Sequence, residues 1–450
     1  MAKRKVTYLP ELVDNNVELS VRHLKQFFKF GRGKSKFITK AVHDVSFDIK
    51  KGECFGVVGE SGCGKTTTGR TLIRLYKATS GSVYFKGYRI AAGNRWNEKE
   101  IKWKRVAARK EIKAIKQERN AQINKIKSDQ EAQKKYADYN QERITWKDAV
   151  ISLIIALMIV TGILVFPLIL GVFFIKKLEN NAVNAVEDEY DLKIKAVKER
   201  LAKLIKEQRE KIKQHNYDNR HVDKKLMTKM QMIFQDPVDS LDPRMTVEDI
   251  IQEGLHIQGQ YNRFENSQKV KDALVKVGLL PEYASRYPHE FSGGQRQRIG
   301  IARALIMNPD FLICDEPISA LDVSIRAQII NLLNNLKEEM GLTIMFIAHD
   351  LSVVKYFCDR IAVMYFGNIV ELASSDELFK HPLHPYTRAL LSAIPKPDPL
   401  SEKVRKRFVY KPQEEHDYSK EGPKLTEIVP GHFVLANSEE LEKYKKEINK

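Results

Sequence analysis

The sequence predicts an α/β protein that is built around a phosphate-binding loop and interrupted by a long helical block. The first observation is the run GESGCGKT at 59–66, which has the GxxxxGK[ST] spacing and lies between an apolar strand, 54–58, and a helix-forming run, 67–76. The second is residues 96–225, whose composition differs from that of both flanks. The third is a pair of later apolar strands that end in Asp315-Glu316 and in His349. Together they predict a nucleotide-binding sheet split by an additional segment.

The run at 59–66 carries the strongest single prediction. Its glycines let backbone N–H groups converge on phosphate oxygens, where the positive end of the following helix adds to the attraction. We expect Lys65 to reach the β- and γ-phosphates and the Thr66 hydroxyl to hold Mg²⁺. A glycine-rich turn that binds no nucleotide is the alternative for the loop alone. The predicted phosphate-binding residues are Gly59, Glu60, Ser61, Gly62, Cys63, Gly64, Lys65, Thr66 and Thr67.

The totals exclude several classes of protein. The 450 residues suffice for two or three domains with a large core. A net charge of +18 suits nucleic acid or an anionic membrane surface. The 4 cysteines are scattered without a CxxC spacing, which predicts reduced cytosolic thiols and neither a disulfide frame nor a zinc or iron–sulfur site. Residues 1–16 lack an apolar run, so we expect no signal peptide.

Before the loop, short strands are expected at 17–21 and 41–49, joined through a basic turn at 31–36. Phe37 lies where an aromatic ring could stack on adenine. Phe28 and Phe30 compete for that role, and packing in the core is an equally good explanation for all three. A further strand is expected at 82–85.

Residues 98–147 and 177–215 are expected to form two long helices. Each is rich in charged residues and carries a thin apolar stripe at spacings of three and four, which suits an antiparallel coiled coil. Two solvated, loosely ordered helices are the alternative. The stripe residues are Ile112, Ile115, Ile123, Ile126, Val183, Val186, Tyr190, Val197, Leu201 and Leu204.

The run 149–175 has no charged residue and exceeds the ~20 residues that mark a membrane span. A single crossing would separate the phosphate loop from the later motifs, and two crossings would need about 40 residues. We therefore expect a re-entrant hairpin or interfacial dip that turns near Thr161-Gly162 or Phe166-Pro167. Lysines on both flanks, Lys147 and Lys176-Lys177, suit ends that both stay cytoplasmic.

The second half adds groups that could complete a phosphate site. A strand at 230–234 ends at Gln235. The run Ser292, Gly293, Gly294 and Gln295 opens an apolar helix, which makes a second phosphate-binding end, with a plain helix cap as the alternative for Ser292.

The strand 311–314 delivers two carboxylates. Asp315 can hold Mg²⁺ through water, and Glu316 can polarise an attacking water as general base. Adjacent residues of a strand point to opposite faces, so a turn after Asp315, helped by Pro317, must bring Glu316 to the site. His349 follows the buried strand 343–348; a structural histidine is the usual interpretation, but here it lies beside the predicted phosphates.

In this order, the motifs resemble the ATP-binding subunit of ABC transporters. They are GESGCGKT (59–66), the Gln235 loop, FSGGQ (291–295), FLICDE (311–316), SALD (319–322) and His349. The runs at 234–247, 315–328, 349–367 and 381–395 resemble, more narrowly, the OppF-type subunits of oligopeptide and dipeptide importers. The resemblance implies a P-loop NTPase with a RecA-like ABC ATPase core and a helical subdomain. It covers about 17–95 and 226–440, and the block 96–225 departs from it as an insertion.

The resemblance also implies a mechanism. Two subunits would face head to tail, with ATP and Mg²⁺ between the Lys65 loop of one and Ser292–Gln295 of the other. Glu316 would position water and His349 the γ-phosphate, while Asp322 would communicate between sites. Gln235 would link Mg²⁺ to the membrane partner. No cysteine follows Cys358, so we expect no iron–sulfur cluster.

The implied protein is an ATPase that drives peptide import from the cytoplasmic face of the cell membrane. Its expected partners are an OppD-like second ATPase, two permease subunits, an external peptide-binding protein indirectly, and membrane lipid through 149–175. The expected domains are 1–95 and 226–380 for the ATPase core, 96–225 for the inserted hairpin and 381–450 for the C-terminal extension.

Three alternatives stay open at this point. In one, the insertion is a scaffold that docks on the permease, and catalysis is secondary. An importer of nickel or another small solute would use the same ATPase. A DNA-maintenance ATPase of the SMC kind also has a coiled coil between these motifs, and its binding to DNA would suit the charge. Its coil would end in a hinge or a metal hook, whereas this one ends in a lipid-like run, so we expect no nucleic-acid partner.

Overall fold

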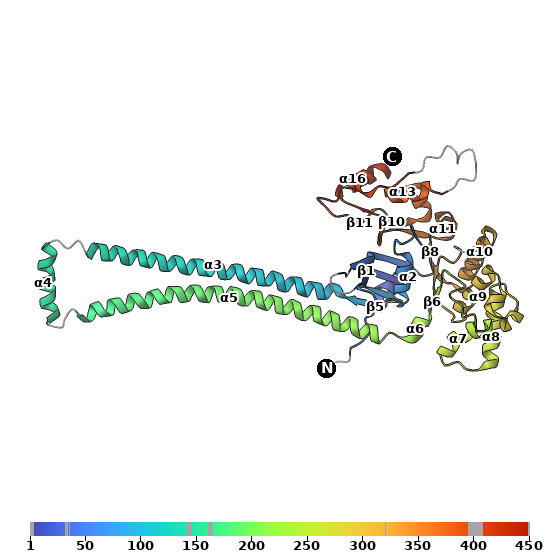
Figure 1. Cartoon of the computed structure of the whole chain (residues 1–450), viewed down its shortest axis with the longest axis horizontal. Helices are drawn as coiled ribbons and strands as arrows, with labels where there is room; N and C mark the ends of the chain where they lie inside the picture. Colours follow the sequence, from blue (N-terminus) through green and yellow to red (C-terminus); the bar gives the residue numbers. More distant parts are fainter. Residues whose placement is uncertain are drawn as a thin grey trace. The chain divides into compact units, whose positions relative to one another are not determined.

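The computed structural model (Figure 1) describes residues 4–31, 35, 37–141, 146–160, 165–319, 321–394 and 408–448. The chain divides into two compact units. The first combines Met1–Trp96 with Lys213–Lys450, and the second is Asn97–Ile212.

Twelve described strands of the first unit form one sheet in the order β5-β4-β1-β2-β10-β9-β3-β8-β7-β6, with β12 beside β10 and β11 beside β12. The strands β9, β3, β8, β7 and β6 are parallel, whereas β1, β2, β4 and β5 are antiparallel. The bounds are β1 Val17–Phe30, β2 Phe37–Lys50, β3 Cys54–Val58, β4 Ser80–Phe85, β5 Tyr88–Asn94, β6 Met230–Ile233, β7 Phe311–Asp315, β8 Thr343–Ala348, β9 Arg360–Tyr365, β10 Asn368–Ser374, β11 Lys424–Val429 and β12 His432–Ala436.

The first two strands are much longer than predicted. The pairing of β1 with β2 continues from Val17 opposite Lys50 to Phe30 opposite Phe37, so the hairpin extends past the apolar cores recognised in the sequence. Cross-strand pairing holds these ends together, although no regular alternation of apolar and polar residues marks them as strands in the sequence. The strand β5, which pairs with β4, was not predicted.

The parallel strands bring the predicted motifs to one edge of the sheet. Every residue of β3, β7 and β8 is buried, as expected for a parallel sheet covered on both faces. The registers place Val58 beside Ala348, and Asp315 beside Ile347. The phosphate loop, the carboxylates and His349 therefore leave the sheet at the same end, where ligands of open α/β sheets bind.

Two hydrophobic clusters lie on the two faces of the sheet. Alternate residues of β7 divide between them, Leu312 and Cys314 into one and Phe311 and Ile313 into the other. The first cluster also contains the apolar sides of α7, α8 and α9, so these helices pack on the same core. The described helices of this unit include α1 Pro10–Asp14, α2 Lys65–Leu72, α6 Lys224–Thr228, α7 Val247–Ile257, α8 Arg263–Lys276, α9 Gly293–Leu305, α10 Val323–Met340, α11 Leu351–Phe357, α12 Ser375–Lys380, α13 Pro385–Ser392, α15 Pro412–Glu415 and α16 Ser438–Ile448.

The second unit consists of α3 (Arg95–Gln141), α4 (Trp146–Val160) and α5 (Val165–Arg220), whose bounds extend beyond the unit at both ends. The helices α3 and α5 lie side by side in Figure 1. The predicted stripe residues are buried or half-buried, with Tyr190 3% and Val197 6% exposed. Three polar side-chain pairs join α3 to α5: Asn97 with Gln208, Glu111 with Arg200, and Arg119 with Asp191. From the first pair to the third, the residue number rises along α3 and falls along α5.

The helix α4 corresponds to the first part of the apolar run. Its side chains from 150 to 157 are exposed, Leu153 and Leu157 to 74% each. In the described ranges, no helix offers an apolar stretch long enough to cross a membrane. A turn at Phe166-Pro167 is wrong, because both residues belong to the first turn of α5, where proline is tolerated. The other predicted turn, Thr161-Gly162, lies outside the described residues.

Candidate functional site

The phosphate loop runs from the end of β3 to the first residue of α2, as its sequence predicts. Two of its glycines are required by close approaches. At Gly59 (φ 149°) a Cβ atom would lie 2.2 Å from the carbonyl oxygen of Met364, and at Gly64 (φ 108°) it would lie 2.2 Å from that of Ala41. Both residues also have positive φ angles, which L-residues rarely adopt. Any side chain at these positions would push the loop away from the sheet.

Lys65 is 4% exposed, and backbone carbonyl groups hold its ammonium group. The Nζ atom donates to the carbonyl oxygens of Gly59 at 2.8 Å and Glu60 at 3.0 Å. It also lies 3.9 Å from Glu316 Oε1. The loop therefore carries its own lysine close to the general-base candidate, with the positive charge compensated by oxygen atoms on two sides.

Asp315 ends β7 beneath the loop. The Thr66 hydroxyl donates to Asp315 Oδ1 at 2.7 Å, which joins the two predicted metal ligands directly. The other carboxylate oxygen, Oδ2, is buried and has no hydrogen-bond partner among the described residues; an Arg70 nitrogen lies 3.9 Å away. Burial raises the pKa of Asp315 above its ordinary value, against the lowering effect of the Thr66 hydrogen bond. A buried carboxylate with one oxygen unpaired is a suitable cation ligand.

Glu316 makes the predicted turn itself. Its φ angle of 47° is left-handed, and its N–H donates to the carbonyl oxygen of Ile347 at 3.0 Å. Such a conformation costs of order 1–3 kcal/mol in a non-glycine residue. It brings the carboxylate to Gln235 and His349, whose Nε2 and Nδ1 atoms lie 3.2 Å and 3.1 Å from Glu316 Oε2. Three distant segments thus meet at one carboxylate oxygen.

These groups line a cavity of about 580 Å³. Its lining residues are Ser61, Gly62, Gly64, Lys65, Thr66, Thr67, Gln235, Glu316, Ser319 and His349. Ser319 was not predicted as a site residue. Its hydroxyl donates to the Glu316 carbonyl oxygen at 3.0 Å and stabilises the turn. Its position in the SALD run was the available signal.

Other predicted site residues do not line this cavity. Ser292 caps α9: its hydroxyl accepts from the Gln295 N–H at 3.4 Å, and the Gln295 side chain accepts from the Ser292 N–H at 3.0 Å. Ser292 and Gly293 are exposed at the start of this helix, followed by Gly294. Asp322 is exposed at the start of α10. Within a single chain, then, the structure does not bring the second phosphate-binding end to the first.

Phe37 also lies outside the cavity lining. Its ring is 59% exposed and stacks on Phe30, with ring centroids 5.2 Å apart. Phe28 packs edge-on against Tyr76 instead, at 5.2 Å. Adenine stacking by Phe37 stays a prediction.

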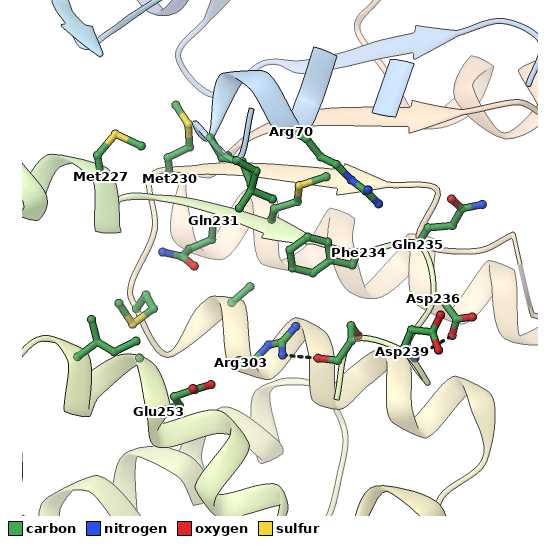
Figure 2. Close-up of a pocket in the computed structure, with 18 of the residues that line it drawn as sticks. Arg70, Met227, Met230, Gln231, Phe234, Gln235, Asp236, Asp239, Glu253 and Arg303 are labelled. Atoms are coloured by element: carbon green, nitrogen blue, oxygen red, sulfur yellow. Dashed lines mark hydrogen bonds between the residues drawn. The ribbon is translucent and has the colours of Figure 1, made fainter. Parts of the chain in front are cut away.

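A second cavity, of about 900 Å³, lies beside the first (Figure 2). Figure 2 shows Met227, Met230 and Phe234 along it, with Asp236 and Asp239 nearer to Gln235. Arg303, whose pKa is lowered by burial, donates to the Ser240 carbonyl oxygen at 2.6 Å. Gln235 lines both cavities, so a single side chain connects them.

Comparison with known proteins gives two family matches and many relatives. The family "ABC transporter" matches residues 42–157 and 197–319, and the family "Oligopeptide/dipeptide transporter, C-terminal region" matches 370–422. Oligopeptide transport ATP-binding protein OppF of Bacillus subtilis is 41% identical over 427 residues, covering 95% of this chain and 98% of that protein. OppF of Streptococcus pyogenes serotype M1 is 40% identical (93% and 95% covered), and AmiF of Streptococcus pneumoniae 39% identical (93% and 96% covered).

Proposed function

The chain belongs to the ABC transporter family, and from that membership we propose that it is the ATP-hydrolysing subunit of an importer of oligopeptides or dipeptides. The observation that carries the proposal is the convergence of Lys65, Thr66 and the Gln235–Glu316–His349 group on one cavity, with Asp315 buried behind it and bonded to Thr66. The match of 370–422 to the C-terminal region of oligopeptide and dipeptide transporters favours peptides over nickel and leaves the DNA-maintenance alternative without support.

In the proposed reaction, the oxygen of a water molecule forms a bond to the γ-phosphorus of ATP, the bond from that phosphorus to the β–γ bridging oxygen breaks, and ADP and phosphate leave. The ammonium of Lys65, placed by the carbonyl groups of Gly59 and Glu60, reaches the β- and γ-phosphates and balances their charge. Gln235 and His349 hold the Glu316 carboxylate in place. This carboxylate accepts a proton from the attacking water. Because its strained backbone fixes the carboxylate, little reorganisation is needed when ATP enters.

The residues around Thr66 fit a magnesium ion. Mg²⁺ retains several waters and usually takes only one or two carboxylates from the protein. Thr66, Asp315 and Gln235 would hold it, and it would neutralise charge on the phosphate oxygens. The unpaired Oδ2 of Asp315 is the feature that supports this assignment.

A complete site requires a second subunit. Ser292, Gly293, Gly294 and Gln295 start a helix whose N-terminal end suits a phosphate, yet they do not line the cavity of their own chain. We assign them to the ATP of an OppD-like sister in a head-to-tail pair, with Asp322 at the boundary between sites and Phe37 as the adenine contact.

The larger cavity is the proposed docking groove for a cytoplasmic helix of the permease. Its methionines and Phe234 offer an adaptable apolar surface for a helix, and Arg303 and Asp239 can fix its orientation. Gln235, which lines both cavities, would report occupancy of the nucleotide site to the two permease subunits. An external peptide-binding protein would act on the far side of the membrane.

The proposed domains follow from these roles. Segments 1–95 and 226–380 form the ATPase core at the cytoplasmic face of the cell membrane, and 381–450 is the C-terminal extension. Segment 96–225 is assigned as an inserted antiparallel coiled coil. Its support is the burial of the two stripes and the opposed order of the polar pairs.

The tip of this coiled coil is assigned to membrane lipid through 149–175. The exposed apolar side chains of α4 and the lysines that flank the run in sequence support the assignment. Replacing Leu153 and Leu157 together by serine should weaken co-flotation with phosphatidylglycerol vesicles roughly ten-fold or more, since burial of one leucine contributes about 1.5–3 kcal/mol. Leu192→Ser, at a 66% exposed site on α5, is the matched control. Equal flotation of all three proteins would contradict lipid contact.

The function itself is tested by nucleotide binding and by co-purification. Lys65→Ala should abolish binding of MgATP to the full-length chain, and the wild-type protein should purify from membranes with two permease subunits and a second ATPase. Wild-type affinity in Lys65→Ala would overturn the proposal.

A further inference from the structure

We infer that Tyr386 of the C-terminal segment holds the outer side of the phosphate loop and thereby positions Lys65. The inference rests on the proposed function and adds a positioning residue to it. Tyr386 lies on α13 and is 1% exposed. Its hydroxyl oxygen accepts a hydrogen bond from the Glu60 N–H at 3.0 Å, across 326 positions of sequence.

The peptide group between Gly59 and Glu60 connects this contact to the lysine. Its N–H donates to Tyr386, and its C=O, the Gly59 carbonyl, accepts from Lys65 Nζ at 2.8 Å. In a planar trans peptide these two groups point in opposite directions. A rotation of the plane would therefore break both bonds, so Tyr386 on one side restrains the carbonyl that Lys65 uses on the other.

A second backbone contact restrains the same loop from the same part of the fold. The Gly367 N–H, in the turn between β9 and β10, donates to the Cys63 carbonyl oxygen at 2.9 Å. The Tyr386 ring packs against Tyr365, which ends β9, with centroids 4.4 Å apart. Two hydrogen bonds thus restrain the phosphate loop, one to the backbone N–H of Gly367 and one to the hydroxyl oxygen of Tyr386.

Tyr386 is itself fixed by a buried network. The carboxylate of Glu371, 0% exposed, accepts from the N–H groups of Leu383 at 2.8 Å and His384 at 3.0 Å. Its Oε1 also lies 2.8 Å from His432 Nε2. The His384 Nδ1 atom then accepts from the Tyr386 N–H at 3.1 Å. These bonds place the turn before α13 with little freedom.

His384 and Tyr386 keep their protonation states over the physiological range. Burial lowers the pKa of His384 to about 3, so its ring stays neutral and Nδ1 stays an acceptor. Burial also raises the pKa of Tyr386, so its hydroxyl stays uncharged. If Tyr386 only filled the core, it would be equally buried, but removal of its hydroxyl would leave the affinity for nucleotide unchanged.

The test uses the substitution Tyr386→Phe, which removes one oxygen and keeps the ring, in the full-length chain for nucleotide affinity and in the assembled transporter for hydrolysis. The control, Tyr410→Phe, removes a hydroxyl from a ring 5.5 Å away in the same cluster. We expect KM for MgATP, and Kd for a fluorescent N-methylanthraniloyl ATP, to rise about 3- to 10-fold in Tyr386→Phe, with kcat within about twofold. Tyr410→Phe should match the wild type.

Amide hydrogen exchange is the second measurement. In Tyr386→Phe the amide of Glu60 should exchange faster, while the amides of β3 should not change. Wild-type affinity in Tyr386→Phe, an equal loss in Tyr410→Phe, or faster exchange throughout β3 would each overturn the inference. The proposed function fails separately, if Lys65→Ala binds nucleotide normally.

Discussion

Replacement of Glu316 by glutamine tests the assignment of the general base. The change keeps the shape of the side chain and the left-handed backbone at φ 47° and removes one negative charge and one proton acceptor. The glutamine carbonyl can still accept from Gln235 and His349, which both bond to the same carboxylate oxygen. The remaining position becomes an amide NH₂ about where Oε1 lies, 3.9 Å from Lys65 Nζ.

The expected cost is the contribution of a positioned general base. That contribution is typically 10²–10⁴-fold, or about 3–5 kcal/mol in the activation barrier. Binding of ATP should be retained or tightened, because a carboxylate beside the anionic phosphates is lost. The protein should therefore hold ATP and turn it over at about 1% of the wild-type rate or less.

The assay is phosphate release at saturating MgATP from the assembled transporter, with retained nucleotide measured after gel filtration. Glu339→Gln, an exposed glutamate on α10, makes the same chemical change away from the cavity and should match the wild type. A kcat for Glu316→Gln within threefold of the wild type would refute the assignment.

Two further predictions concern stability. Asp315→Asn should raise the Tm of the nucleotide-free protein at pH 7.5 by roughly 1–3 °C. Burial raises the pKa of Asp315 in the folded protein above 3.8. The stability that this group contributes is therefore complete below pH 3.8 and is lost as the pH rises through the folded pKa. Asparagine does not titrate, so the gain should vanish toward pH 4, and thermal melts with equal Tm at pH 7.5 would contradict the buried-charge argument. Phe346→Ala on β8 should lower the free energy of unfolding by about 3–5 kcal/mol in urea, since Phe346 is fully buried and packs against Phe357 at 4.9 Å; a loss below 1 kcal/mol would show that the cavity collapses.

Much of the nucleotide site was predictable because its signals are local. The GxxxxGK[ST] spacing between strand and helix located the loop, and the apolar runs at 54–58, 311–314 and 343–348 located three strands that lie in the sheet as predicted. The two long helices were also evident from composition and stripe spacing, although α5 begins twelve residues earlier than expected, at 165 against 177. Burial patterns and helix periodicity are properties of short windows of sequence.

Other features had no local signal. The ends of β1 and β2 lack a regular alternation of apolar and polar residues and are held by cross-strand pairing, so periodicity did not find them. Phe30 and Phe37 stack on each other across that hairpin, a contact that requires the full strand length. Ser319 became part of the site because it bonds to the strained turn at Glu316.

The sequence by itself therefore determined which residues could carry the chemistry, since backbone conformation and side-chain type are written locally. Only the tertiary structure decided which of them meet. Parallel strand order brings Lys65, Asp315, Glu316 and His349 to one edge, whereas Ser292 does not line the cavity there. The bond from Glu60 to Tyr386 is the clearest case: it spans 326 positions, and its partners become neighbours only when the C-terminal segment packs against the sheet. Contacts between residues so far apart in sequence form only when the whole chain has folded, and the helix and strand preferences of short segments do not predict them.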